Sequence, residues 1–168
     1  MKKLTLFIIG CSIFTAGLAQ KKDNMKFSVG AELAFATGNL SNTHSIGVGG
    51  SAQLEIPVQE KLNAVAYGGI TFYNGRSNGV GSKYKGVRII PVRVGLKYFL
   101  TGRVYGSFQT GVGLIGSFEP YNGTAFYTHQ LGYEFQTNSG KSIDLSFKYD
   151  GYSKKSLGSF GFRLAYIL

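Results

Sequence analysis

The sequence ends on "SFGFRLAYIL" (Ser159–Leu168), where apolar residues alternate strictly with the remaining residues. The apolar set is Phe160, Phe162, Leu164, Tyr166 and Leu168. A period of two is typical of a β-strand with two unlike faces. Left as a bare terminus, such a strand would be a hydrophobic sheet edge, which favours aggregation. We therefore expect this last strand to pair with another part of the same chain.

Seven further segments show a related alternation, and they define an all-β protein. They are Lys26–Ala36, Ser45–Val58, Leu62–Tyr73, Val87–Phe99, Arg103–Phe118, Thr124–Gln136 and Lys141–Asp150. The connections after the second, fourth and sixth segments are tight, whereas the others tend to be longer and polar. An even number of strands with short turns at one end predicts an eight-stranded, antiparallel, up-and-down transmembrane β-barrel. We assign residues 26–168 to this single domain.

The two faces of these strands differ in charge. In the seven strands of clear parity, the central apolar face has no charged residue. The opposite face carries four acids and four bases: Glu32, Glu55, Arg93, Lys97, Glu134, Asp144, Lys148 and Arg163. In Leu62–Tyr73 the parity is ambiguous, and we favour Ala64, Ala66, Gly68, Ile70 and Phe72 as the apolar face. Because a Lys or Arg facing lipid at mid-bilayer costs about 2–4 kcal/mol, we expect the charged face to fill a narrow lumen without an open pore.

The N-terminus has the pattern of a secretory signal peptide. Lys2 and Lys3 precede an apolar stretch, and Gly17-Leu18-Ala19 forms a small-x-small cleavage site. Residues 8–11 also resemble a lipidation site at Cys11, but the apolar stretch continues past Cys11 to Ala19. We therefore expect cleavage after Ala19, which leaves residues 20–25 as a short periplasmic tail and removes the only cysteine of the chain.

The chain is strongly basic, with 18 Lys and Arg against 8 Asp and Glu. For an exported protein this balance points to anionic lipid head groups rather than nucleic acid. Six basic residues cluster in or beside two of the longer loops: Arg76, Lys83, Lys85, Arg88, Lys154 and Lys155. In the barrel topology they face outward, where we expect contacts with lipopolysaccharide phosphates. The alternative is a loop that is merely solvated.

The C-terminal alternation resembles the signal that outer-membrane proteins present to the barrel-assembly machinery, with Leu168 where that signal usually has Phe. The chain is similar to small barrels of the OmpA/OmpX type and to outer-membrane β-barrel or porin-family proteins of Bacteroidetes. The segments "IIPVRVGLKYF" (Ile89–Phe99) and Leu18-Ala19-Gln20 carry this likeness. The resemblance implies the Gram-negative outer membrane, periplasmic termini and a structural or surface-interaction role. It indicates no particular protein partner.

Two other functions are compatible with parts of this sequence. A secreted, soluble, lipocalin-like barrel would bind an apolar ligand inside and would turn its charges outward. A lipid A-modifying outer-membrane enzyme would need a nucleophile beside its base, but the residue two positions after His129 is Leu131. We therefore predict no catalytic, cofactor or metal site. We expect His129 to be a girdle or cross-strand residue and His44 to be a solvent-exposed loop residue.

The sequence also predicts two local features. Aromatic residues near strand ends are expected to form girdles at the membrane interfaces. They are Tyr73, Tyr98, Phe99, Phe118, Tyr121, Tyr127, Phe135 and Tyr149. Pro91 lies within a predicted strand and cannot donate to a ladder, so we expect either a bulge or lost pairing there.

Overall fold

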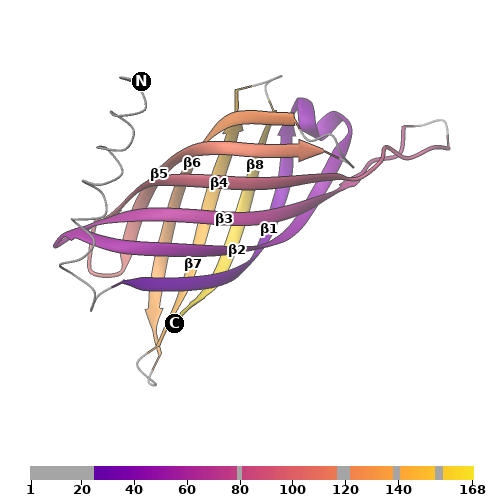
Figure 1. Ribbon diagram of the computed structural model, residues 1–168. Coiled ribbons are helices and arrows are strands. Elements are labelled where there is room, and N and C mark those ends of the chain that lie inside the picture. Colours follow the sequence, from indigo (N-terminus) through magenta and orange to yellow (C-terminus); the bar gives the residue numbers. More distant parts are fainter. Residues whose placement is uncertain (1–24, 79–80, 117–121, 138–140, 154–156) are drawn as a thin grey trace, which may run out of the picture.

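The computed structural model is a closed antiparallel β-barrel (Figure 1). It describes residues 25–78, 81–116, 122–137, 141–153 and 157–168. Its strands are β1 (Lys26–Gly38), β2 (His44–Gln59), β3 (Leu62–Gly75), β4 (Val87–Phe99), β5 (Val104–Gly116), β6 (Asn122–Gln136), β7 (Ser142–Tyr152) and β8 (Leu157–Ile167). The predicted fold is confirmed. The predicted signal peptide and nearly all of the tail lie outside the described residues.

The strand bounds agree with the sequence prediction to within two residues at every end. The first loop holds an unpredicted element, the 3₁₀-helix η2 (Asn39–Asn42), whose Leu40 is buried. We call the end with connections 60–61, 100–103 and 137–141 the turn end, and the opposite end the loop end. β1 begins and β8 ends at the turn end. No helix in the described part of the chain is long and apolar enough to cross a membrane.

The C-terminal strand closes the barrel. Phe162 of β8 pairs with Leu33 of β1 on one side and with Phe147 of β7 on the other. Beyond the last strand residue, the amide of Leu168 donates to the carbonyl of Phe27 at 2.8 Å. The apolar terminal strand therefore has partners along both edges, which resolves the aggregation problem of a bare edge.

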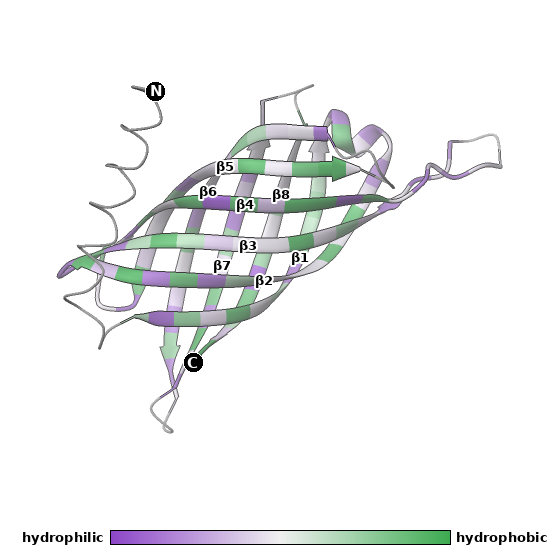
Figure 2. Cartoon of the chain, in the orientation of Figure 1, coloured by the Kyte–Doolittle hydropathy of each residue, from purple (hydrophilic) through white to green (hydrophobic). Residues whose placement is uncertain are grey.

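The outer face is apolar and the inner face is polar, so hydropathy alternates along the strands (Figure 2). Val94 and Leu164 point outward and are 60% and 56% exposed, whereas Arg93 and Lys148 are buried inside. Strand β3 follows the favoured parity, because Tyr67 points inward and Phe72 outward. A soluble lipocalin-like barrel would have the reverse arrangement.

Pro91 interrupts pairing without shifting it. Strands β3 and β4 pair at Gly68–Val92 and again at Thr71–Ile89, in the same register, with no pair between. Pairing on the other side of Pro91, with Gly113 of β5, is intact. The missing proline N–H therefore costs local pairing rather than producing a bulge. Register shifts occur instead between β2 and β3, near each end of β2.

The lumen has an apolar layer at the loop end and a charged layer below it. The apolar layer consists of Ala34, Leu40, Tyr73, Ile89, Phe126 and Tyr152. Its Tyr73 corrects one girdle prediction, since this side chain is 3% exposed and points inward. Phe99 is the second correction, because it lies on the lumen side and packs against Tyr105. Both follow the strict alternation of their strands, which overrides their position near strand ends. Phe118 and Tyr121 lie outside the described residues.

Candidate functional site

All eight charged residues predicted for the lumen are placed inside, and none of them, counted with its backbone, is more than 6% exposed. The structure adds a ninth, Asp150 of β7, which is 5% exposed. Arg93 Nη1 lies 3.1 Å from Asp150 Oδ1 and also donates to Thr128 Oγ1 at 2.8 Å. Sequence reasoning missed Asp150 because it was the last residue of its predicted strand. The available signal was its even spacing from Asp144 and Lys148, which places all three side chains on the same face of the strand.

One charged cluster lies at mid-barrel. Lys148 Nζ lies 2.6 Å from Glu32 Oε2 and 3.3 Å from Asp150 Oδ2. The Tyr67 hydroxyl donates to Glu32 Oε1 at 2.5 Å. The Arg93 guanidinium lies 3.5 Å from the centroid of the Tyr67 ring, a cation–π contact. These contacts join β1, β3, β4 and β7 across the lumen.

A second cluster lies towards the turn end. Lys97 Nζ is 2.7 Å from Glu55 Oε1 and 2.6 Å from Glu134 Oε1. The other oxygen of Glu134, Oε2, lies 2.9 Å from the ammonium of Lys26. Asn63 donates to Glu55 Oε2 at 3.1 Å. Every carboxylate oxygen of Glu55 and Glu134 therefore has a donor.

Arg163 of β8 connects the two clusters. Its Nε lies 3.8 Å from Glu32 Oε1 and its Nη1 lies 3.5 Å from Asp144 Oδ1. It also donates to the hydroxyls of Ser51 at 2.9 Å and Ser28 at 3.0 Å. Within the described residues, five carboxylates face five cations: Glu32, Glu55, Glu134, Asp144 and Asp150 with Lys26, Arg93, Lys97, Lys148 and Arg163. This neutral network crosses the lumen and acts as its polar core.

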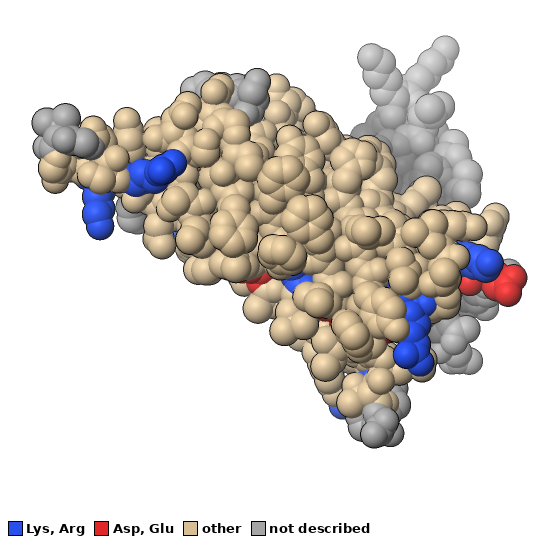
Figure 3. All heavy atoms as spheres, turned by 180° about the vertical axis from the view of Figure 1, so that it is seen from behind, with Lys and Arg blue, Asp and Glu red and all other residues tan. Residues whose placement is uncertain are grey.

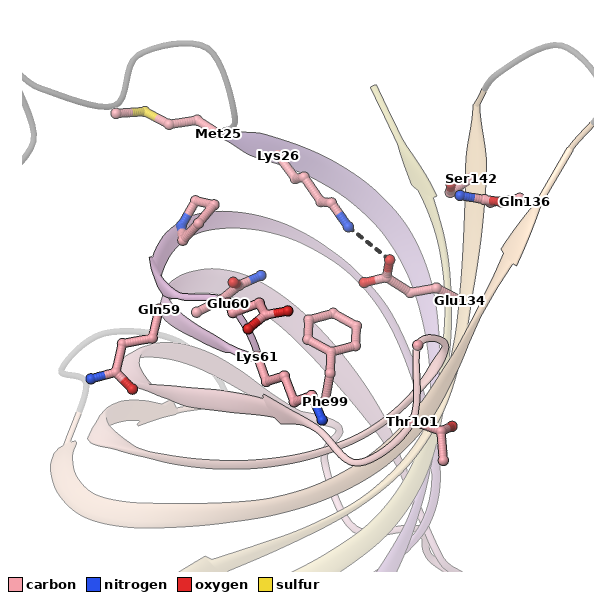
Figure 4. A pocket seen from close by; sticks show the side chains of 13 residues that line it. Met25, Lys26, Gln59, Glu60, Lys61, Phe99, Thr101, Glu134, Gln136 and Ser142 are labelled. Carbon is pink, nitrogen blue, oxygen red and sulfur yellow. Dashed lines mark hydrogen bonds and ion pairs between the residues drawn. The ribbon is translucent and has the colours of Figure 1, made fainter.

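A cavity of about 830 Å³ opens at the turn end, next to the second cluster (Figure 4). We call it the vestibule. Lys26 and Glu134 form an ion pair on one side of it, and Phe99 and Lys61 point into it from the neighbouring wall. The remaining lining residues are Met25, Pro57, Gln59, Glu60, Asn63, Thr101, Gly102, Gln136 and Ser142. The lumen is thus filled by apolar side chains at the loop end and hollow at the turn end.

The basic residues predicted as lipopolysaccharide contacts are only partly gathered. Arg76, Lys83 and Lys85 are exposed on an arm that extends β3 and β4 beyond the barrel (Figure 1). The Tyr84 amide donates to the Arg76 carbonyl at 3.0 Å, so the arm is a hairpin. Figure 3 shows basic side chains standing out on this projection, while most of the visible barrel wall is uncharged.

The other three predicted contacts differ in position. Arg88 lies in β4 on the outer face, 5.3 Å from the ring centroid of its cross-strand neighbour Phe72. It therefore belongs to the barrel wall near the loop end rather than to the arm. Lys154 and Lys155 lie outside the described residues.

His44 corrects a sequence prediction, because it is buried rather than solvent-exposed. Its Nε2 lies 3.1 Å from the carbonyl oxygen of Lys85, and its Nδ1 lies 2.8 Å from the hydroxyl of Thr43. Arg76 Nη1 donates to the carbonyl of Ser41 at 2.8 Å. The base of the arm is thus attached to the β1–β2 loop, a long-range contact that loop composition does not indicate.

His129 lies on the outer face, where its ring packs 5.1 Å from Phe108 and 5.6 Å from Tyr127 between centroids. Leu131, on the same face, is the next outward residue of β6. His129 is thus a cross-strand residue, as expected. In the described residues, no group of three His, Cys, Asp or Glu side chains is arranged to hold a metal ion.

No family model matches this sequence. No curated protein matches it either. Solved structures with the same fold include Ail of Yersinia pestis in complex with the heparin analogue sucrose octasulfate, with a TM-score of 0.57 and 12% identity over 86% of this chain and 97% of Ail. Neisserial surface protein A has a TM-score of 0.59 and 13% identity over 86% of this chain and 96% of its own. A designed transmembrane β-barrel has a TM-score of 0.51 and 12% identity over 85% of this chain and 95% of its own. These likenesses establish the eight-stranded barrel fold.

Proposed function

We propose that this chain is an integral outer-membrane β-barrel with a non-enzymatic, structural or surface-interaction role. The observation that carries the proposal is the inversion of its faces: aliphatic side chains such as Val94 surround the barrel while charged ones such as Arg93 fill it. A continuous exposed apolar surface of this kind is unfavourable in water. In a bilayer it is the stable arrangement, because closure also satisfies the backbone groups of every strand.

The proposal has a direct test. The protein is expressed in a Gram-negative host, the envelope is fractionated, and unheated and boiled samples are compared on detergent gels. We expect the protein in the outer membrane and a folded band that migrates differently from the boiled one. A folded, monomeric protein that stays dissolved in detergent-free buffer would overturn the membrane assignment.

We further propose that the arm binds the phosphates of lipopolysaccharide, which is the surface-interaction role in concrete form. Arg76, Lys83 and Lys85 are exposed on it, and the sequence has no acidic residue from Gly75 to Arg93. Positive charges without acidic neighbours in the same segment attract anions over distances of several ångströms. The heparin analogue bound by Ail is a sulfated sugar, so a barrel of this fold accommodates a polyanion.

The arm is tested with the triple variant Arg76→Gln, Lys83→Gln, Lys85→Gln in lipid nanodiscs. Binding of lipopolysaccharide is expected to weaken by about tenfold or more and to lose much of its dependence on salt. The matched control is Lys61→Gln, Arg103→Gln, Lys141→Gln, which removes the same charge at the turn end. Equal weakening in both variants would reduce the effect to net charge and exclude a site on the arm.

The remaining parts of this proposal concern origin and assembly. We propose that the chain belongs with the OmpA/OmpX-type barrels of Bacteroidetes and that Phe160, Phe162, Leu164, Tyr166 and Leu168 are recognised by the barrel-assembly machinery. These side chains lie on the outward face of the closing strand and of the residue that follows it. Replacing Tyr166 and Leu168 with Ser is expected to slow assembly in cells more than refolding in detergent. Equal slowing of assembly in cells and of refolding in detergent would mean that the substitutions only destabilise the barrel.

A further inference from the structure

The vestibule has the features of a small binding site that the proposed function does not use. It lies at the opposite end of the barrel from the arm, and about 830 Å³ is within the range of ligand pockets. Its walls carry two lysines, two glutamates, amides and hydroxyls rather than the usual aliphatic lining. The ligand that fits it is therefore small and polar.

The ion pair between Lys26 and Glu134 is the accessible part of this lining (Figure 4). The side chain of Lys26 is 40% exposed, whereas that of Glu134 is 8% exposed. Glu134 keeps a second lysine, Lys97, at 2.6 Å on its other oxygen. Lys26, the exposed partner, can therefore turn into solvent at little cost, while Lys97 still pairs one oxygen of the buried Glu134.

Opening the pair leaves two requirements. Lys97 is already shared with Glu55 at 2.7 Å and with Asp144 at 3.8 Å, so Glu134 needs a replacement cation to keep the cluster neutral. Lys26, once displaced, needs a replacement anion. A singly charged ligand satisfies one of these requirements and worsens the other. A molecule with an ammonium and a carboxylate a few ångströms apart satisfies both.

Phe99 supplies the third part of the site. Its ring centroid lies 5.6 Å from the ammonium of Lys26 and 5.2 Å from that of Lys97. A ligand ammonium that takes the place of Lys26 beside Glu134 also takes its place near this ring, where the cation–π attraction is retained. The side chain of the ligand lies in the open volume beyond, which also has room for larger side chains.

We propose that the vestibule binds free α-amino acids, by insertion between Lys26 and Glu134. The ligand ammonium pairs with Glu134 and its carboxylate pairs with Lys26. The result is an alternating row of charges that continues into Lys97 and Glu55. The proposal is independent of whether the arm binds lipopolysaccharide, because the two sites lie at opposite ends.

The experiment is an NMR titration of the isotope-labelled protein in nanodiscs with L-alanine, propionate and ethylammonium. L-Alanine is expected to give saturable shifts at the backbone amides of Lys26, Gly102 and Gln136. Propionate lacks the ammonium and ethylammonium lacks the carboxylate, so each is expected to bind about tenfold more weakly or worse. Equal affinity for L-alanine and propionate would reveal a plain anion site and overturn the proposal, as would the absence of saturable shifts.

Lys26→Gln tests the assigned contact. Binding of L-alanine is expected to weaken about tenfold in this variant and to recover in Lys26→Arg, which keeps the charge. Lys141→Gln is the matched control, because it removes one positive charge at the turn end outside the vestibule. Unfolding midpoints in urea show whether each variant is folded. Unchanged L-alanine binding by folded Lys26→Gln would overturn the proposal.

Discussion

Lys148 of β7 and Glu32 of β1 form a buried ion pair, with Nζ 2.6 Å from Oε2, although β8 lies between their strands. Neither side chain is more than 3% exposed. The pair thus joins strands that share no ladder, and Lys148 reaches Glu32 over Gly161 of β8, where an added Cβ would lie 3.3 Å from Lys148 Cε. Burying charges is costly, and the cost is offset only where hydrogen bonds complete the geometry, as Tyr67 does for Glu32.

Removing one member of this pair should be worse than removing both charges. Lys148→Met leaves Glu32 in the lumen without its nearest cation, and we expect the free energy of unfolding to fall by about 3–5 kcal/mol. The double variant Glu32→Gln, Lys148→Met should recover part of that loss, measured by urea unfolding in lipid vesicles. Lys61→Met, at the turn end, is the control and should stay within about 0.5 kcal/mol. A Lys148→Met variant as stable as this control would mean that the pair contributes nothing.

The lipid-facing assignment predicts a depth-dependent cost for added charge. Val94 lies one residue from the middle of β4, whereas Ile46 is the third residue of β2 near the loop end. Val94→Arg is expected to lower the free energy of unfolding in vesicles by about 2–4 kcal/mol, and Ile46→Arg by about 0–1 kcal/mol. Equal costs at the two depths would contradict a bilayer around the barrel.

Strand alternation explains why the fold was predictable from the sequence. A one-residue error in parity would exchange the two faces of a strand. The charged residues Glu32, Arg93 and Lys148 lie opposite the apolar residues of their strands, so they fix which face is inside. The same alternation turns the side chain of Asp150 into the lumen. It also turns Lys26 inward, at the turn end of the lumen. Both residues are terminal in their predicted strands, Lys26 the first and Asp150 the last, and alternation alone does not show whether a terminal side chain faces the lumen or the water beyond it.

Contacts between distant loops were not predictable in this way. The burial of His44 depends on the arm folding back so that the Lys85 carbonyl reaches its ring. Tyr73 and Phe99 were misassigned for a different reason: they lie near strand ends, where aromatic girdles are typical, but the alternation of their strands turns both into the lumen. The vestibule likewise follows from the sizes and registers of many side chains, which no single segment reveals.

Glycines of the wall should differ sharply in their tolerance of a methyl group. A Cβ at Gly132 would lie 2.4 Å from the Tyr105 ring, which is fully buried, whereas one at Gly68 would meet nothing within 4 Å. Gly132→Ala is expected to lower the free energy of unfolding by about 1–3 kcal/mol through overpacking. Gly68→Ala should be neutral or stabilising by up to about 1 kcal/mol. Urea unfolding of both variants in vesicles measures this, and an equally tolerated Gly132→Ala would mean that Tyr105 is free to move aside.

His44 should control the order of the arm without affecting the barrel. His44→Ala removes the hydrogen bond to the Lys85 carbonyl, so the arm should open more often and trypsin should cleave after Arg76, Lys83 or Lys85 about 3- to 10-fold faster. The urea midpoint of the barrel should change little, because His44 lies at the first residue of β2. His129→Ala is the matched control, since it removes the other histidine from the outer face. If His129→Ala accelerated cleavage as much as His44→Ala, the effect would be a general loss of stability, and the attachment of the arm through His44 would be wrong.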